Sequence, residues 1–450
     1  MTGLPRNTSA SIIACSGSRP IFRYRCANKR ERWCAAMDGK LKDAMPVIER
    51  LSAAGHQAYF VGGCVRDALL GRPIGDVDIA TSARPEAVMA IFPKHVPTGI
   101  RHGTVTVFVK GRSYEVTTFR TESDYDDHRR PSDVAFVDDI RTDLKRRDFT
   151  VNAMAMDADG RVIDPFGGMS DLERGIIRCV GSPDERFRED ALRMVRAVRF
   201  AAELGFRIAP STWRALRRNA GLLRHIALER VGAELDKMIC GADPDRAAAL
   251  FIRSGLWRTT KTPLKAPGLP ACAGKVRLSD LAAGDRRWIA LWAASNVSPE
   301  AARSWMSRFA FGKKRMRAIF EPLQLHAAAA CIPDTRDDWA ALALRHGRQA
   351  AADWLDVMRA LPGVSPVPAD RLERWSAWLA DMPAFTAAEL ALDGTELAEA
   401  AGRKGGPWIK RTMDRLLLET AAGRLPNERR ALLERALHIL DTQADGKDER

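Results

Sequence analysis

The spacing of apolar and polar positions changes once along the chain, near residue 185. Before that point short amphipathic stretches alternate with short apolar runs, and apolar residues recur at helical spacing over 41–51. Period-two or continuous apolar patterns predict short strands at 58–61, 76–79, 105–109 and 114–119. Tight polar turns such as Lys110 to Ser113 favour a small, partly antiparallel sheet over a doubly wound one.

After residue 185 the strand pattern disappears, and an Ala-, Leu- and Arg-rich helical pattern continues almost to the C-terminus. Trp288 and Trp292 stand one helical turn apart, which indicates helices packed through tryptophan. Clusters of Pro and Gly near 262–274 and 362–369 interrupt the pattern. We therefore predict an α+β protein with a disordered extension over 1–36, a mixed-sheet head over 37–185, and a helical neck over 186–250, body over 251–385 and tail over 386–450.

The first 36 residues differ from the rest in charge. They contain seven Lys or Arg residues against the single acid Glu31, and they show no hydrophobic period. An Arg- and Ser-rich, acid-poor segment fits a transit peptide, but Met37 directly precedes the first periodic helix. We therefore favour translation from Met37 as the explanation for this segment.

Composition narrows the class of partner. Of the 450 residues 46% are hydrophobic, and no apolar run is long enough to span a bilayer, so no membrane is expected. The excess of 71 Lys and Arg over 57 Asp and Glu, a net charge of +14, favours a polyanionic partner such as nucleic acid. The eight cysteines form no C-x-x-C pair, which argues against structural zinc and suggests a reducing, cytoplasmic location.

A pair of aspartates is the first candidate for chemistry. Asp76 and Asp78 flank Val77 in a predicted strand, so both carboxylates leave the same face. Two adjacent carboxylates repel, and a divalent cation such as Mg²⁺ relieves that repulsion. Glu115 would join them if the 114–119 strand pairs beside the 76–79 strand.

A glycine-rich turn precedes the aspartates. Gly62 and Gly63 end a strand and begin a helix, where backbone N–H groups can approach a phosphate, and Arg66 on that helix would meet a triphosphate. The spacing is neither a P-loop nor a dinucleotide fingerprint.

A third group recurs every three residues in a stretch predicted to be one helix. Asp190, Arg193, Arg196 and Arg199 would then face one site. Cytosine and adenine both present an amine donor beside a ring-nitrogen acceptor, so the carboxylate of Asp190 can accept from the amine and Arg193 can donate to the ring. Uracil and guanine present the reverse order, which leaves both side chains unsatisfied. Arg196 and Arg199 suit a triphosphate better than a base.

The order of these motifs resembles that of the class II CCA-adding tRNA nucleotidyltransferases, within the poly(A) polymerase and tRNA nucleotidyltransferase family. Most of the matching motifs lie within about 56–240. The main motifs are Gly62–Asp67, Gly75–Asp78, Arg146–Ala153 and Arg188–Arg193. Supporting motifs are His102–Thr106, Glu115–Arg120, Asp164–Gly168 and Glu203–Phe206.

The resemblance implies a head related to DNA polymerase beta, followed by helical neck, body and tRNA-binding tail. It implies two Mg²⁺ ions, with Asp76 and Asp78 as metal ligands and Glu115 as a third active-site carboxylate. By their positions in the family's motifs, the expected nucleotide contacts are the glycine turn at Gly62 and Gly63 together with Arg66, Arg147, Asp190, Arg193, Arg196 and Arg199.

The expected reaction is attack by the 3′-hydroxyl of tRNA on CTP and ATP, which adds CCA and releases pyrophosphate; no obligate protein partner is evident. A poly(A) polymerase and an A-only or CC-only tRNA nucleotidyltransferase remain alternatives. The polar segment 120–137 is predicted to be a mobile loop, similar to the flexible loop of family members that add the final A.

Overall fold

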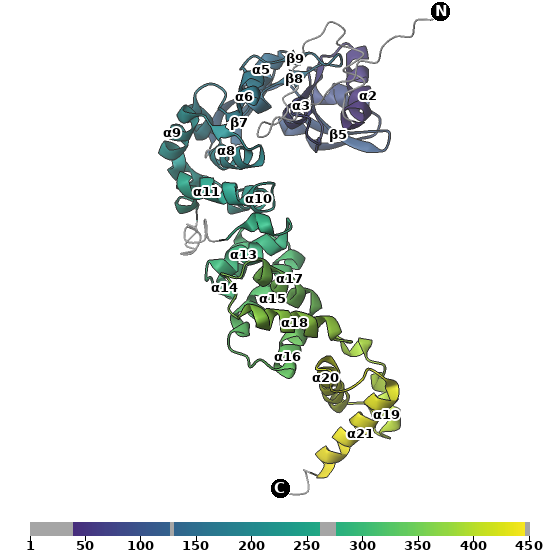
Figure 1. The fold of residues 1–450 in the computed structure, drawn as a ribbon. Coiled ribbons are helices and arrows are strands. Elements are labelled where there is room, and N and C mark those ends of the chain that lie inside the picture. Colours follow the sequence, from purple (N-terminus) through teal and green to yellow (C-terminus); the bar gives the residue numbers. More distant parts are fainter. Residues whose placement is uncertain (1–38, 127–129, 262–275, 446–450) are drawn as a thin grey trace, which may run out of the picture. The chain divides into compact units, whose positions relative to one another are not determined.

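A computed structural model describes residues 39–126, 130–261 and 276–445, so the predictions for residues 1–36 lie outside the described residues. The chain divides into two compact units. In the described residues, the head unit runs from residue 39 to Asp124 and from Pro131 to Ser182, and the helical unit contains Pro183 onward together with a short piece near residue 125. Figure 1 gives the order of their elements along the chain.

The head unit is built on a seven-stranded mixed sheet, in the order β3-β4-β5-β2-β1-β8-β9. Its strands are β1 (Ala58–Val61), β2 (Asp78–Thr81), β3 (His95–Gly99), β4 (Thr104–Val109), β5 (Arg112–Thr118), β8 (Ala155–Met156) and β9 (Val162–Ile163). Its paired strands are antiparallel except β2 and β5, which run parallel. The predicted mixed sheet is therefore confirmed.

The hairpin between β4 and β5 shows why the turn forms where the sequence places it. Lys110 and Gly111 both adopt positive φ, 50° and 77°, as a two-residue hairpin turn with the twist of its strands requires. Glycine takes this conformation without strain.

Helices cover the sheet of the head unit. The predicted first helix is α2 (Gly39–Ala53), which buries Leu41, Ala44, Val47, Ile48 and Leu51 and packs against β1 and β4. The other elements are α3 (Gly63–Leu69), α4 (Pro85–Ile91), η1 (Ile100–His102), α5 (Ile140–Lys145), η2 (Thr150–Asn152), α6 (Gly168–Arg174) and β10 (Ile176–Ile177).

The segment predicted to be a mobile loop, 120–137, is instead largely strand. β6 (Arg120–Asp126) and β7 (Arg130–Phe136) form a two-stranded sheet, and residues 127–129 lie outside the described residues. Backbone hydrogen bonds between paired strands do not depend on hydrophobic period, so a polar sequence can still form a two-stranded ribbon.

The helical unit contains only helices, apart from the short strand β11 (Arg207–Ile208), in its described residues from Pro183 onward. Its first helices are α7 (Pro183–Glu189), α8 (Leu192–Glu203), α9 (Pro210–Asn219), η3 (Ala220–His225), α10 (Leu228–Ile239), α11 (Pro244–Ser254), η4 (Leu256–Arg258) and η5 (Leu278–Asp280). They are followed by α13 (Asp285–Ala294), α14 (Pro299–Arg308), α15 (Lys313–Ala329), α16 (Arg336–His346), α17 (Arg348–Ala360), α18 (Ala369–Asp381), η6 (Ala387–Glu389), α19 (Gly394–Ala400), α20 (Pro407–Ala421) and α21 (Arg429–Asp445).

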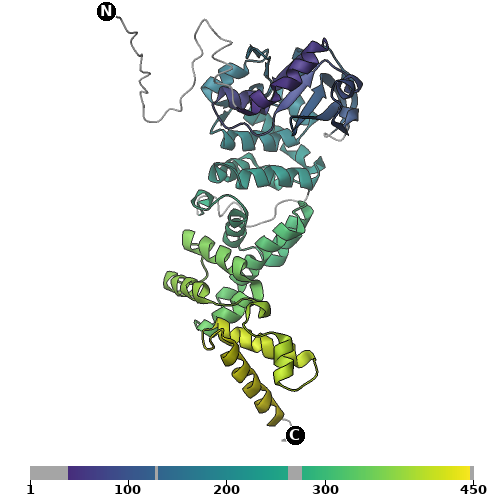
Figure 2. The same cartoon turned by 90° about the vertical axis from the view of Figure 1, so that its right-hand side faces the viewer.

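Tryptophans connect these helices, as the sequence predicts. The rings of Trp339 and Trp375 stack at 4.4 Å between centroids, and Trp354 lies 6.0 Å from Trp375. Trp288 and Trp292 stack at 6.0 Å. Trp339 of α16, Trp354 of α17 and Trp375 of α18 are fully buried, so these three side chains form a shared core of the three helices. Figure 2 shows the helices of this part of the chain in green.

Within the described parts of the chain, every helix is too short or too polar to cross a bilayer.

Close packing at Gly232 on α10 makes a prediction for stability. A Cβ atom at this position would lie 2.5 Å from Cδ1 and 2.6 Å from Cβ of Phe309. Gly232→Ala should therefore lower the free energy of unfolding by about 1–3 kcal/mol, the cost of overpacking a core. Gly221→Ala, where a Cβ meets nothing within 4 Å, is the matched control. Urea denaturation measures the free energy of unfolding of both variants. Equal values for the two variants would contradict the prediction.

Candidate active site

Strand pairing brings the three predicted carboxylates of the head unit together. β2 and β5 pair in a register that places Asp78 directly opposite Glu115. Asp76 and Asp78 are exposed while Val77 between them is buried, so both carboxylates leave the same side. The prediction that Asp76 lies in the strand is wrong, because β2 begins at Asp78. Exposed and buried residues nevertheless alternate from Asp76 through Val77 to Asp78, as they do within a strand.

The electrostatics of this cluster favour a cation. Desolvation raises the pKa of Asp78, and the nearby charges of Glu115 and Asp76 raise it further, while Arg147 opposes them. A hard divalent cation would relieve the repulsion, and carboxylate oxygens are its preferred ligands. Among the described residues no three His, Cys, Asp or Glu side chains already form a closed metal cluster. The donor chemistry thus fits a metal that also takes ligands from its substrate.

Two arginines flank the glycine turn next to these carboxylates. A Cβ on Gly62 would lie 2.8 Å from Nη1 of Arg147 and 3.9 Å from a carboxylate oxygen of Asp78. A Cβ on Gly63 would lie 3.7 Å from Nη2 of Arg66. Gly62 has a φ of 74°, which favours glycine. The missing side chain of Gly62 therefore leaves room for the guanidinium group of Arg147 near Asp78, whereas a Cβ on Gly63 would make only an ordinary contact with Arg66.

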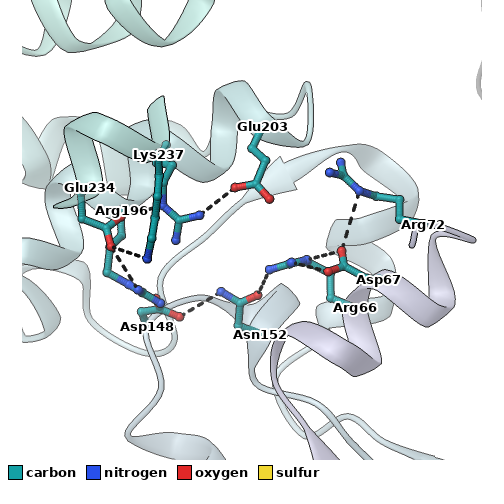
Figure 3. A network of polar contacts seen from close by, with 10 residues as sticks. Arg66, Asp67, Arg72, Asp148, Asn152, Arg196, Glu203, Glu234 and Lys237 are labelled. Carbon is teal, nitrogen blue, oxygen red and sulfur yellow. Dashed lines mark hydrogen bonds and ion pairs between the residues drawn. The ribbon is translucent and has the colours of Figure 1, made fainter. Parts of the chain in front are cut away.

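The chain itself holds the guanidinium of Arg66. It donates from Nε and Nη2 to the carboxylate of Asp67 at 3.0 and 2.8 Å, and from Nη1 to Oδ1 of Asn152 at 2.7 Å. Asn152 in turn donates to Asp148 at 3.2 Å. Figure 3 shows Asn152 between Arg66 and Asp148. The sequence predicted Arg66 as a phosphate contact and missed Asn152, whose signal was only its place in the Arg146–Ala153 motif.

The predicted base-reading residues do not share one helix. α8 begins at Leu192, and Asp190 lies in the break between α7 and α8. The carboxylate of Asp190 accepts a hydrogen bond from the backbone N–H of Leu192 at 3.0 Å. A carboxylate that binds a backbone N–H in this way favours a cap or turn over a helix interior, which explains the break.

Asp190 also has an ionic partner that the sequence did not identify. Arg230 of α10 donates to its two oxygens at 2.9 and 3.5 Å. Arg193, which is buried, donates to Glu189 at 2.6 Å. Both predicted base-reading side chains are therefore held in place within the helical unit.

Arg196 and Arg199 are joined to α10 through the buried Glu234. Arg199 donates to Glu234 at 2.6 Å and to Glu203 at 2.7 Å. Arg196 lies 3.7 Å from the other oxygen of Glu234, as Figure 3 shows. The regular spacing of three indicated a common role for these arginines, but it contained no sign of their acidic partners.

Family models match most of the chain. Residues 58–178 match the poly A polymerase head domain. Residues 205–260 match the probable RNA- and SrmB-binding site of polymerase A, and residues 280–436 match the tRNA nucleotidyltransferase domain 2.

Curated relatives and solved structures agree with these matches. The CCA-adding enzyme of Geobacillus stearothermophilus is 43% identical over 401 residues, which cover 87% of this chain and 96% of the relative. That of Geobacillus thermodenitrificans is 44% identical, with 87% and 96% covered. The crystal structure of the Bacillus stearothermophilus CCA-adding enzyme in complex with CTP superposes with a TM-score of 0.77 at 40% identity, covering 91% of this chain and 100% of that one.

A more distant structure shares the fold alone. The Thermotoga maritima CCA-adding enzyme complexed with tRNA-CCA has a TM-score of 0.58 at 20% identity, covering 92% of this chain and 99% of that one. The predicted α+β fold, with a nucleotidyltransferase head followed by helices, is thus confirmed.

The buried carboxylate that pairs with Arg147 leads to a prediction about how stability depends on pH. Burial alone would raise the pKa of Asp143, but Arg146 and Arg147 overcome that effect and hold the pKa below its ordinary value. Its stabilising contribution is therefore complete above the pKa of the unfolded chain and is lost as the pH falls through the lower folded value.

Asp143→Asn should accordingly lower the free energy of unfolding at pH 7 by about 3 kcal/mol, as for a broken buried pair. The difference in free energy of unfolding between the variant and the unchanged protein should shrink below about pH 4, where aspartate protonates in the unfolded chain. Urea denaturation across this pH range checks it, with the exposed Asp138→Asn as control. A difference independent of pH would show that the charge of Asp143 is not responsible.

Proposed function

This chain belongs to the CCA-adding enzyme family, and we propose that it is itself a CCA-adding tRNA nucleotidyltransferase, which adds C, C and A to the 3′ end of tRNA from CTP and ATP and releases pyrophosphate. The observation that supports the proposal is the Asp78–Glu115 register, because it joins two of the proposed catalytic carboxylates next to the double-glycine turn, in a chain that matches these enzymes over most of its length.

The family uses a divalent metal, and we assign Asp76 and Asp78 as its ligands, with two Mg²⁺ ions as the proposed identity and number. When bound, such ions activate the 3′-hydroxyl and neutralise the triphosphate. Glu115 adds a third negative charge on the other side of Asp78. Desolvation first, and then repulsion by Glu115 and Asp76, raise the pKa of Asp78, so the cluster favours positive charge at this point.

Arg147 and Arg66 hold the triphosphate over the glycine turn. Their guanidinium groups flank Gly62 and Gly63, where no side chain intervenes. Arginine matches phosphate oxygens with paired N–H donors. Because Asp143, Asp67 and Asn152 already orient these guanidinium groups, little conformational entropy is lost when the nucleotide binds.

Asp190 and Arg193 select the base by accepting from the exocyclic amine and donating to the ring nitrogen of cytosine or adenine. Arg230 and Glu189 orient these two side chains. Arg196 and Arg199 complete the proposed nucleotide-binding group. We place the reaction in the reducing cytoplasm, which suits Cys64, Cys179, Cys240 and Cys331 as free thiols.

Nucleotide omission tests the function. A tRNA that ends before CCA should gain two residues with CTP alone and three with CTP and ATP, read at single-nucleotide resolution on a gel. A long A tract would support a poly(A) polymerase, and a product that stops after CC, or needs a CC end to begin, would support a CC-only or A-only enzyme.

Asp78→Asn should lower the rate by roughly a thousandfold or more, since it removes a metal ligand at the reacting centre.

Base selection makes a separate prediction. Asp190→Asn replaces an obligate acceptor with an amide that can also donate to the carbonyl of uracil. We expect kcat/KM for UTP relative to CTP to rise at least about tenfold, the size of one hydrogen-bond mismatch near 1.4 kcal/mol. The affinity for tRNA, measured by filter binding, should change little. An unchanged UTP to CTP ratio in an active variant would remove Asp190 from base selection.

A further inference from the structure

The helix α10 makes different contacts on its two faces, and both sets lie within the helical unit. One face contacts the proposed base-selecting residues. Arg230 donates to both oxygens of Asp190, and the buried Glu234 accepts from Arg199. Residues four apart lie on one face of a helix, so Arg230 and Glu234 reach α8 and the break before it from the same side of α10.

The other face of α10 is bound through Asp236. Asp236 comes two residues after Glu234, which turns its side chain by about 200° around the helix axis. Arg315 of α15 donates to both oxygens of Asp236, each at 2.7 Å, and to Asp285 of α13 at 2.5 Å. Trp288 of α13 donates to Asp236 at 2.8 Å. Burial would raise the pKa of Asp236, but the hydrogen bonds from Arg315 and Trp288 hold this pKa below its ordinary value.

The last carbonyl groups of α10 are bound as well. The buried Arg287 of α13 donates from Nη1 to the carbonyl of Ile239 at 3.1 Å and to that of Gly241 at 2.7 Å. A cation is favourable at the C-terminal end of a helix, where the final carbonyls have no partner inside the helix. The carbonyl contacts limit movement of α10 along its axis, and the contacts of Asp236 limit its rotation.

A single helix therefore connects the contacts of α13 and α15 to those of the base-selecting residues. Arg230 and Asp236 are six residues apart, which is about 9 Å along a helix. A shift or rotation of α10 at Asp236 would move Arg230 and Glu234 with it. Because hydrogen bonds weaken steeply with poor alignment, and a binding site requires placement within about 0.5 Å, such a shift would release Asp190.

We propose that Arg315 is a positioning residue for base selection, which acts through Asp236 and α10 on Arg230 and so on Asp190. The inference rests on the proposed function and adds to it a determinant of nucleotide specificity in α15, a helix that contributes no predicted nucleotide contact. Arginine suits this role because its planar group binds two carboxylates at once with paired donors.

Substitution of Arg315 tests the proposal. In Arg315→Gln, kcat/KM for UTP relative to CTP should rise about threefold to tenfold, because Asp190 is no longer held in one orientation. The measurement is addition of the first nucleotide to a tRNA lacking CCA, with each nucleotide alone. Both rates come from the same sample, so the ratio does not depend on the folded fraction. Arg315→Lys keeps the charge without the paired donors, so its ratio should lie between those of Arg315→Gln and the unchanged protein.

Arg286 offers a matched control, because it joins α13 to α17 with the same kind of contact. It lies 2.7 Å from Asp353 and 2.9 Å from Asp356, and 35% of its side chain is accessible, against 32% for Arg315. Arg286→Gln should therefore affect stability to a similar degree and leave the ratio of UTP to CTP unchanged. An equal rise in both variants would overturn the proposal.

A double variant tests the route through α10. If Arg315 acts through Arg230, the ratio in Arg230→Gln combined with Arg315→Gln should equal that in Arg230→Gln alone. Effects that multiply would show two independent routes and would contradict the proposal. An unchanged ratio in Arg315→Gln would also overturn it, while CCA addition by the unchanged protein would still support the proposed function. Failure of the unchanged protein to extend tRNA would instead refute the proposed function.

Discussion

The parallel pairing of β2 with β5 is the contact on which the active site depends. It places Asp78 opposite Glu115, so two like charges face each other on one side of the sheet. Like charges directly opposite each other destabilise a sheet; desolvation raises the pKa of Asp78, and the charge of Glu115 raises it further. The buried residues on the other face, such as Ile79 and Val116, hold the register. A slip of one residue would turn the carboxylates into the core.

Acidic and amide partners arranged around the arginines of the proposed nucleotide site are the second recurring feature. Arg66 is held by Asp67 and Asn152, Arg147 by Asp143, Arg193 by Glu189, and Arg199 by Glu234. An arginine fixed in this way keeps its charge and presents its remaining donors in a defined direction. A chain with a net charge of +14 thus fixes these arginines within each unit by local acidic partners, so they are not flexible surface side chains.

The head unit therefore has a sequence of charges across its sheet. Arg147 and Arg66 flank the glycine turn, the carboxylates of Asp76, Asp78 and Glu115 follow, and Lys40 and Arg112 line a pocket beyond them. Positive and negative groups therefore alternate across the sheet of the head unit. The strand order β1, β2, β5 underlies this sequence, because the glycine turn follows β1, Asp78 begins β2, and β5 carries both Glu115 and Arg112.

The sequence by itself determined the local features of this protein: the mixed sheet and later helices, the aspartate pair, the double glycine and the packing role of the tryptophans. These depend on hydrophobic period and on the intrinsic preferences of neighbouring residues, which a single chain contains. It misplaced Asp190 within a helix and read the β6–β7 ribbon as a loop, because a side-chain cap and backbone pairing leave no trace in hydrophobic period. Only the tertiary structure decided that Glu115 lies opposite Asp78, that Arg230 holds Asp190 and that a pocket lies beside the carboxylates. Each of these joins residues far apart along the chain, and such contacts are set by the packing of whole elements.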